Sequence, residues 1–144
     1  MKIYIGADHR GFELKNKLAE WLKEQGNEVE DCGNTVLDPL DDYVDFANTV
    51  ALAVIADAKS LGIVICGSGV GVCVSANRHR GIICALSFDA HQASHARAND
   101  HANMISLPSN YVTLEKAKEI VAAFLQVTPK TNEKYLRRAK KLDE

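Results

Sequence analysis

Short apolar runs alternate along the chain with longer stretches in which apolar residues recur at helical spacing. One run, Leu61–Cys66, contains Ile63, Val64 and Ile65 without a charge, which is typical of a strand buried on both faces of a parallel sheet. Another run, Glu28–Cys32, mixes acidic and apolar residues and is predicted as an edge strand. The pattern predicts five strands, at Lys2–Gly6, Glu28–Cys32, Leu61–Cys66, Gly81–Leu86 and Asn103–Leu107.

The stretches between these runs carry an apolar residue every three or four positions, so each is predicted as a helix with one buried face. Gly26 is predicted to close the first helix, and Asp89 and Thr113 to cap two later ones. His91 and His95 are predicted as surface residues of the helix after Asp89. Helices are predicted at Leu14–Leu22, at Tyr43–Ile55, after the glycines near residue 70, at His91–Arg97, at Thr113–Leu125 and at 131–142.

This alternation of strand and helix predicts an α/β protein with a three-layer Rossmann-like fold. Its expected architecture is a five-stranded parallel sheet with right-handed crossovers, helices on both faces and a C-terminal helix. We expect residues 1–144 to form one domain, because no repeat or linker interrupts the pattern. Ligands of such folds bind beyond the carboxyl ends of the strands. Three segments are expected to meet there: Asp8-His9, Cys66–Gly71 and Asn99–His101.

A thiol followed by alternating glycines is the most distinctive chemical feature of the sequence. Cys66 ends the third predicted strand, and Gly67-Ser68-Gly69-Val70-Gly71 follows it. Glycines let the backbone turn sharply, and the free N–H groups of a following helix then point at whatever lies over Cys66. Such a site suits an oxyanion or a phosphate. Alternatively, the turn serves only tight packing and Cys66 is a small buried hydrophobe.

Other features of the sequence narrow the classes of function. The glycine spacing is not that of a dinucleotide fingerprint, and no Lys-Ser or Lys-Thr pair follows as in a nucleotide-triphosphate loop. The formal net charge of −2 argues against sequence-independent binding of nucleic acid, and no apolar run is long enough to cross a membrane. The four cysteines show no C-x-x-C spacing, so we expect a reduced, cytoplasmic protein.

Several motifs together resemble one known family, the type B ribose-5-phosphate isomerases and the related galactose-6-phosphate isomerase subunits. The resemblance covers essentially the whole chain. It implies an aldose–ketose isomerase that needs no metal and no cofactor, and that forms a homodimer or tetramer with each site built from two subunits. It rests on Gly6–Phe12, Asp42-Tyr43, Gly62–Gly71, Ala76-Asn77, Ala102-Asn103 and the basic helix 131–142, which is expected to pack on the partner subunit.

The resemblance also implies roles for individual residues. Cys66 is implied to remove the proton from C2 of an open-chain sugar, giving a cis-enediolate. Val72 stands where another branch of the family has a glutamate base, so Cys66 is the only candidate for the base that the resemblance offers. The positive end of a following helix would favour its thiolate form. The other implied residues are Ser68, Gly67, Gly69, Val70 and Gly71 for the anion hole, Asp8, Tyr43 and Asp100 for substrate hydroxyls, and His9, Lys134 and Arg138 for phosphate.

Two of the chain's departures from the family pattern leave its substrate open. Asn99 stands where relatives carry a histidine implicated in opening the sugar ring, and an imidazole returns only at His101. Either Asp100 or His101 reaches the ring from a rearranged loop, or the enzyme relies on spontaneous ring opening. Asn110 stands where relatives carry a phosphate-binding arginine. These departures leave two alternatives to a ribose 5-phosphate isomerase: an isomerase of a hexose 6-phosphate or free aldose, and a non-catalytic protein that only binds a sugar phosphate.

Overall fold

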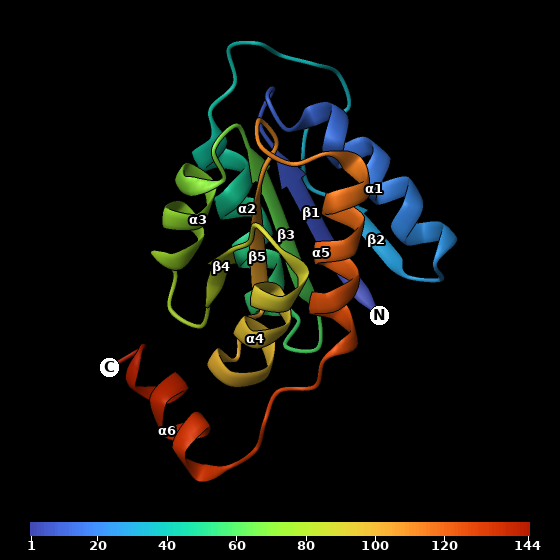
Figure 1. Ribbon diagram of the computed structural model, residues 1–144. Helices are drawn as coiled ribbons and strands as arrows, with labels where there is room; N and C mark the ends of the chain where they lie inside the picture. Colours follow the sequence, from blue (N-terminus) through green and yellow to red (C-terminus); the bar gives the residue numbers. More distant parts are fainter.

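Five strands and six helices alternate along the chain, as the hydrophobic pattern predicts (Figure 1). The computed structural model describes residues 1–144. The elements are β1 (Lys2–Ala7), α1 (Phe12–Glu24), β2 (Glu28–Asp31), α2 (Tyr43–Ala56), β3 (Leu61–Cys66), α3 (Val70–Asn77), β4 (Cys84–Leu86), α4 (Ala90–Asp100), β5 (Met104–Pro108), α5 (Leu114–Gln126) and α6 (Glu133–Lys141).

The strands form one parallel sheet in the order β2-β1-β3-β5-β4. The central strand β3 is buried along its whole length, whereas β2 lies at an edge and is largely exposed, as predicted. The chain adds β2 on one side of β1 and β3 on the other, so the strand order reverses between β1 and β3. In open α/β sheets, ligands bind at such a reversal, beyond the carboxyl ends of the strands. Here those ends lead to Asp8 and Cys66.

Helices cover both faces of the sheet, which confirms the three-layer prediction. Side chains of a strand alternate between the faces, so Ile63 and Ile65 pack with α1, α4 and α5, while Val64 and Cys66 pack with α2 and α3. Figure 1 shows α2 and α3 on one side of the sheet and α1 and α5 on the other. The register of β3 thus points the thiol of Cys66 toward the layer that contains α2 and α3.

The ends of several elements follow from local hydrogen bonds. The Asp89 carboxylate accepts from Gln92 N at 2.8 Å and the Thr113 hydroxyl accepts from Lys116 N at 3.1 Å, so both predicted caps are confirmed. Strand β4 is shorter than the predicted Gly81–Leu86 and begins at Cys84. Gly81 has a φ of +88°, which is not extended backbone, and the N–H of Ile83 donates to a side chain instead of a strand.

The segment Asn99–His101 lies at the amino-terminal ends of the strands, whereas Cys66 lies at the carboxyl ends. The prediction that this segment lies at the carboxyl ends was therefore wrong. It directly precedes β5, whose first residue Met104 pairs with Gly62 near the start of β3, whereas Cys66 pairs with the last residue of β5. A segment that leads into a parallel strand lies at the amino-terminal ends of the strands. The segment that follows β5 reaches their carboxyl ends instead. Helix α6 also lies near the amino-terminal ends of the strands (Figure 1), where Asp143 accepts from Gly81 N at 3.1 Å.

Candidate active site

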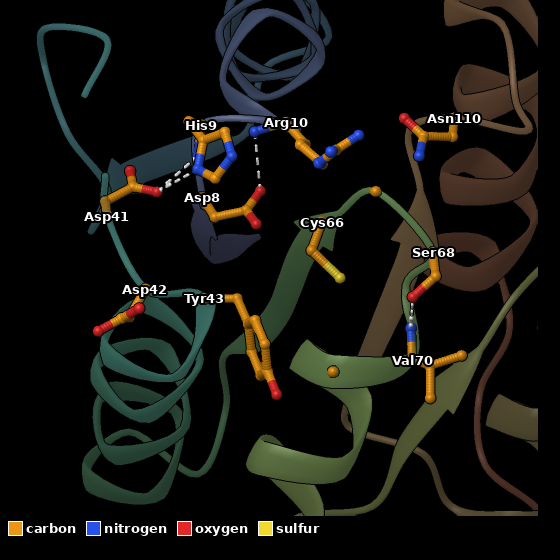
Figure 2. Close-up of a pocket in the computed structure, with 12 residues that line it drawn as sticks. Asp8, His9, Arg10, Asp41, Asp42, Tyr43, Cys66, Ser68, Val70 and Asn110 are labelled. Atoms are coloured by element: carbon orange, nitrogen blue, oxygen red, sulfur yellow. Dashed lines mark hydrogen bonds and ion pairs between the residues drawn. The ribbon is translucent and has the colours of Figure 1, made fainter. Parts of the chain in front are cut away.

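A cleft of about 560 Å³ opens at the carboxyl ends of β1 and β3, where the reversed strand order predicts a ligand. The loop after β5 completes one rim and the start of α2 another (Figure 2). The lining residues are Asp8, His9, Arg10, Asp41, Asp42, Tyr43, Cys66, Gly67, Ser68, Val70, Gly71 and Asn110.

Asp8 fixes the loop that follows β1. Its side chain is buried, with 5% of the residue exposed, and its Oδ1 accepts from the N–H groups of Arg10 at 3.0 Å and Gly11 at 3.1 Å. One carboxylate oxygen therefore holds the turn together, and the carboxylate faces the cleft between His9 and Cys66 in Figure 2. A buried, backbone-bonded carboxylate of this kind is a rigid hydrogen-bond acceptor at the wall of the cleft.

Cys66 and the glycine turn form the floor of the cleft. The thiol of Cys66 points into the cleft from the end of β3, although the residue is only 4% exposed (Figure 2). Gly69 has a φ of +73°, which side chains disfavour, and this conformation lets α3 begin at the next residue. The N–H groups of Gly67, Ser68 and Gly69 donate to no group of the chain. They are therefore open donors for an anion beside the thiol.

The hydroxyl of Ser68 has a structural partner in this turn. Its oxygen accepts from the N–H of Val70 at 3.1 Å, so the Val70 amide, expected in the anion hole, is engaged within the turn itself. Across the cleft, Tyr43 begins α2 and its ring lies on Gly71, where a Cβ would come within 2.7 Å of the ring. Helix packing thus places the Tyr43 side chain opposite Cys66 (Figure 2).

His9 is held by Asp41, a residue that the sequence pattern did not single out. Asp41 Oδ1 accepts from the backbone N–H of His9 at 2.9 Å and lies 2.8 Å from its Nδ1, and Oδ2 accepts from Asn34 at 3.0 Å. The imidazole is 30% exposed and the carboxylate only 7%. The acidic loop 33–42 has no periodicity, so only its proximity to the predicted Asp42-Tyr43 site could have drawn attention to Asp41.

Asp8, His9 and Asp41 place possible metal ligands within 4.8 Å of one another. However, the same atoms are used inside the chain, because Asp8 Oδ1 accepts from two backbone amides and Asp41 bonds His9 and Asn34. Oδ1 of Asp8 and both oxygens of Asp41 thus already form hydrogen bonds that position the loops, and Oδ2 of Asp8 forms none within the chain. The expectation that no metal and no cofactor takes part stays a prediction.

Several residues with predicted roles do not reach the cleft of their own chain. At the C-terminal end of α4, His101 has a φ of +60° and its Nε2 lies 2.8 Å from the carbonyl oxygen of Lys130. Asn99 instead contacts the ring of His95, with its Nδ2 3.2 Å from Nε2. The residues outside the cleft are Asn99, Asp100, His101, Lys134 and Arg138, all on α4, its C-terminal end or α6.

The other three cysteines lie outside the cleft and are free thiols. A hydrogen bond from the Cys84 thiol is the main cause that lowers the pKa of Cys73 to about 6, and the same contact together with burial raises the pKa of Cys84. Burial, with Glu30 and Asp31 nearby, raises the pKa of Cys32 to about 11. Cys73 points toward β4, where its sulfur lies 3.4 Å from the carbonyl oxygen of Cys84, so it cannot meet a ligand over Cys66.

Comparison with known proteins identifies the family. Residues 3–142 match the family model described as Ribose/Galactose Isomerase. The chain belongs to this family. It is 48% identical over 124 residues to the probable ribose-5-phosphate isomerase B of Mycoplasma pneumoniae, covering 86% of this chain and 82% of that protein. It is 42% identical over 125 residues to ribose-5-phosphate isomerase B of Mycobacterium tuberculosis, covering 87% and 77%.

Solved structures of the family confirm the fold. The crystal structure of ribose-5-phosphate isomerase B from Mycoplasma genitalium with bound ribulose 5-phosphate matches with a TM-score of 0.93 at 39% identity, covering 98% of this chain and 93% of that one. The enzyme from Thermotoga maritima also gives 0.93 at 39% identity, covering 99% and 97%. None of the helices here is long and apolar enough to pass through a membrane.

Proposed function

We propose that this protein interconverts ribose 5-phosphate and ribulose 5-phosphate. The observation that carries this proposal is the Cys66 thiol, which faces a cleft beside the open N–H groups of Gly67, Ser68 and Gly69. An aldose–ketose isomerisation needs one base close to C1 and C2 and donors for the charge that develops on oxygen. The names of the Mycoplasma and Mycobacterium relatives supply the substrate.

The reaction follows from these groups. Cys66, as thiolate, takes the proton from C2 of the open aldose, and the electron pair moves through C1 to the aldehyde oxygen. The negative charge of the resulting cis-enediolate lies next to the amides of the glycine turn. The thiol then returns the proton to C1 while the proton of the C2 hydroxyl passes to the C1 oxygen. C1 is reduced and C2 is oxidised within one molecule, so atoms and electrons balance without a redox partner.

Asp8 and Tyr43 have the positions of groups that orient the sugar chain. The buried Asp8 carboxylate accepts from hydroxyls on one side of Cys66, and the Tyr43 hydroxyl lies on the other (Figure 2). Such positioning contributes to rate because the C2 proton must be aligned with the sulfur before transfer. The cleft of about 560 Å³ is large enough for a five-carbon sugar phosphate.

We propose further that the working unit contains two copies of the chain, as a homodimer or a tetramer built from it. Asn99, Asp100, Lys134 and Arg138 lie at the opposite end from their own cleft, so a role at a site requires the cleft of a second copy. Helices α2 and α3, next to the cleft, also expose apolar side chains, with Leu52 57%, Ile55 44%, Val70 49% and Val74 48% exposed. A second copy would cover this surface.

A different sugar is the second candidate function, and Asn99 is the observation that favours it. Its carboxamide cannot exchange protons with a sugar ring, so the chain lacks an acid–base group at the position implied to open a furanose. A substrate that is largely open would avoid this step. A non-catalytic binding protein is disfavoured, because binding alone does not require a thiol over the sugar carbons.

A panel of substrates tests these candidates. The purified protein is assayed in both directions with pentose and hexose phosphates and with free aldoses, together with Cys66→Ala. We expect turnover of ribose 5-phosphate and a loss of about 10²- to 10⁴-fold in Cys66→Ala. Cys73→Ser, a thiol outside the cleft, is the matched control. Activity of Cys66→Ala within about threefold of wild type would exclude the thiol as base, and turnover of a hexose phosphate alone would reassign the substrate.

A further inference from the structure

Arg10 is the one lysine or arginine among the twelve residues that line the cleft. Three aspartates, Asp8, Asp41 and Asp42, line the same cleft. Within one chain, a phosphate dianion that enters the cleft therefore meets three carboxylates and the guanidinium of Arg10. Without a cation at this place, repulsion would favour an unphosphorylated sugar.

The guanidinium of Arg10 is free to bind an anion. It forms no hydrogen bond and no ion pair within the chain, although carboxylates lie in the same cleft. Asp8 is engaged by two backbone amides, and Asp41 by His9 and Asn34. The five N–H donors of a guanidinium form a fork that matches phosphate oxygens, and here all five remain open toward the cleft and the solvent.

The backbone of Arg10 is fixed by hydrogen bonds within its own loop and with the loop after β5. Its N–H donates to Asp8 Oδ1 at 3.0 Å and its carbonyl oxygen accepts from Ser109 Oγ at 2.9 Å. The N–H of Ser109 in turn donates to the carbonyl of Cys66 at 2.9 Å. The start of the side chain is therefore held in place relative to the thiol, and only its outer part is free to adjust to a ligand.

Arg10 and Asn110 approach one point from two sides. A Cβ at Gly67 would lie 2.8 Å from Arg10 Cδ and 2.8 Å from Asn110 Nδ2, and the N–H of Asn110 donates to Gly67 O at 3.0 Å. Figure 2 shows both side chains at the rim above Cys66 and Ser68. A guanidinium and a carboxamide thus approach one space at the rim of the cleft, over Gly67.

We propose that Arg10 binds the phosphate group of the substrate at this rim, with the Asn110 amide as its partner, and that it sets the preference for phosphorylated over free sugars. The inference rests on the proposed isomerase function and assigns one of its binding residues. Loss of a charge-assisted contact of this kind weakens binding by about 10- to 100-fold. The contact is made equally in ground and transition states, so KM changes and kcat does not.

Arg10→Gln and Arg10→Lys test the role by steady-state kinetics with ribose 5-phosphate. Arg10→Gln is expected to raise KM about 10- to 100-fold, and Arg10→Lys by less, because lysine keeps the charge but not the fork. Arg78→Gln removes an exposed arginine at the end of α3 and is the control. A KM of Arg10→Gln within twofold of wild type, or a loss in kcat alone, would overturn the proposal.

A relocated arginine gives the sharper test. In Arg10→Gln with Asn110→Arg, the guanidinium returns to the same point from the other side of Gly67, and most of the lost affinity is expected to return. No recovery would show that Arg10 acts through the shape of its loop, and would overturn the proposal.

Calorimetry separates this inference from the proposed function. Ribose 5-phosphate, free ribose and inorganic phosphate are titrated into Cys66→Ala, with and without Arg10→Gln. Weaker binding of both phosphates and unchanged binding of ribose supports the role of Arg10. If the wild-type protein turns over no sugar phosphate, the proposed function fails. The titration with inorganic phosphate still decides whether Arg10 binds a phosphate group. Equal affinity for inorganic phosphate in the two proteins would then overturn it.

Discussion

One oxygen of Asp41 holds both the backbone and the imidazole of His9, at 2.9 Å from the N–H and 2.8 Å from Nδ1. The carboxylate thereby favours the form of His9 in which Nδ1 carries a proton, and leaves Nε2 for the cleft. His9 is therefore a side chain with a fixed direction, and its fixation depends on a residue from a different loop.

Asp41→Ala is expected to raise KM for ribose 5-phosphate by about tenfold, the scale of one charge-assisted hydrogen bond, with little change in kcat. The resemblance implies that His9 binds the phosphate, and a freed imidazole would no longer be held in position for that contact. The measurement is a double-mutant cycle with His9→Ala, because residues that act through one another are not additive. Asp41→Ala should have little further effect once His9 is removed. Full additivity would contradict the positioning role.

The thiols outside the cleft offer a pH-dependent test of their surroundings. Cys73 and Cys32 are both half-buried, but the pKa of Cys73 is lowered to about 6 by the Cys84 thiol, and that of Cys32 is raised to about 11 by burial. A thiolate reacts and a thiol does not. In Cys66→Ala, alkylation of Cys73 by iodoacetamide should therefore be near its maximum at pH 7.5 and fall as the pH drops through about 6.

The rate at Cys32 should instead climb about tenfold per pH unit between pH 7 and 10, because its thiolate fraction does. Mass spectrometry of peptides at several pH values measures the two rates in one sample. A rate at Cys73 that keeps rising from pH 7 to 9, in parallel with Cys32, would contradict the lowered pKa. Replacement of Cys84 by alanine should reduce the difference between the pH profiles of Cys73 and Cys32, because the donor that stabilises the Cys73 thiolate is then lost.

Much of the fold and the centre of the site could be predicted, because both depend on regular patterns. The uninterrupted apolar run at Ile63–Ile65 indicated a central strand, and the alternating glycines after Cys66 indicated a helix that begins beside the thiol. Arg10 and Asp41 could not be found in this way. Their importance depends on hydrogen bonds between loops distant in sequence, such as the one between Ser109 and Arg10, and no periodicity encodes these.

The location of Asn99–His101 was mispredicted for a topological reason. A helix that crosses over to a parallel strand ends near the amino-terminal ends of the strands. The segment between α4 and β5 therefore lies at those ends, whichever residues it contains. Asn110, at the other end of β5, does reach the cleft. The arginine that the resemblance implies at position 110 is absent, and in our proposal Arg10 supplies the guanidinium from the neighbouring loop.

His101 has a structural role that bears on ring opening. Its ring holds the carbonyl of Lys130 at 2.8 Å, and the N–H of Lys130 donates to the carbonyl of Ala98 at 2.9 Å, so the segment before α6 is pinned to the end of α4. A ring so engaged is not available to shuttle protons, which favours spontaneous opening of the sugar. We expect His101→Ala to lower the melting temperature by a few degrees, as loss of about 1 kcal/mol does in a domain of this size.

The kinetic consequence separates the two explanations for the missing histidine. If His101 only pins the chain, His101→Ala should affect turnover of ribose 5-phosphate and of ribulose 5-phosphate equally. His101→Asn is the matched control, since asparagine tolerates the left-handed conformation and removes the imidazole. A loss confined to the ribose 5-phosphate direction in both variants would reveal a ring-opening role instead, because ribulose 5-phosphate has no furanose ring to open.

Mixed assemblies of two damaged chains decide whether one site needs two subunits. Cys66→Ala lacks the proposed base, and Arg138→Ala lacks a proposed phosphate contact at the opposite end of the chain. In a heterodimer of the two, one cleft combines the intact Cys66 of one chain with the intact Arg138 of the other, and the second cleft has neither. Each heterodimer should therefore contain one intact site of its two, so protein made only of heterodimers should have about half of the wild-type sites.

The two variants are co-expressed with different affinity tags, purified through both tags, and assayed below the KM of the wild-type enzyme, where a binding defect is fully visible. Each variant alone is the control and is expected to be nearly inactive under these conditions. If Arg138 instead served the cleft of its own chain, the doubly tagged protein would contain only damaged sites, and its activity would be no more than the mean of the two parents. Recovery well above that mean requires Arg138 to reach across to a partner, because no pairing of damaged chains can otherwise create an intact cleft.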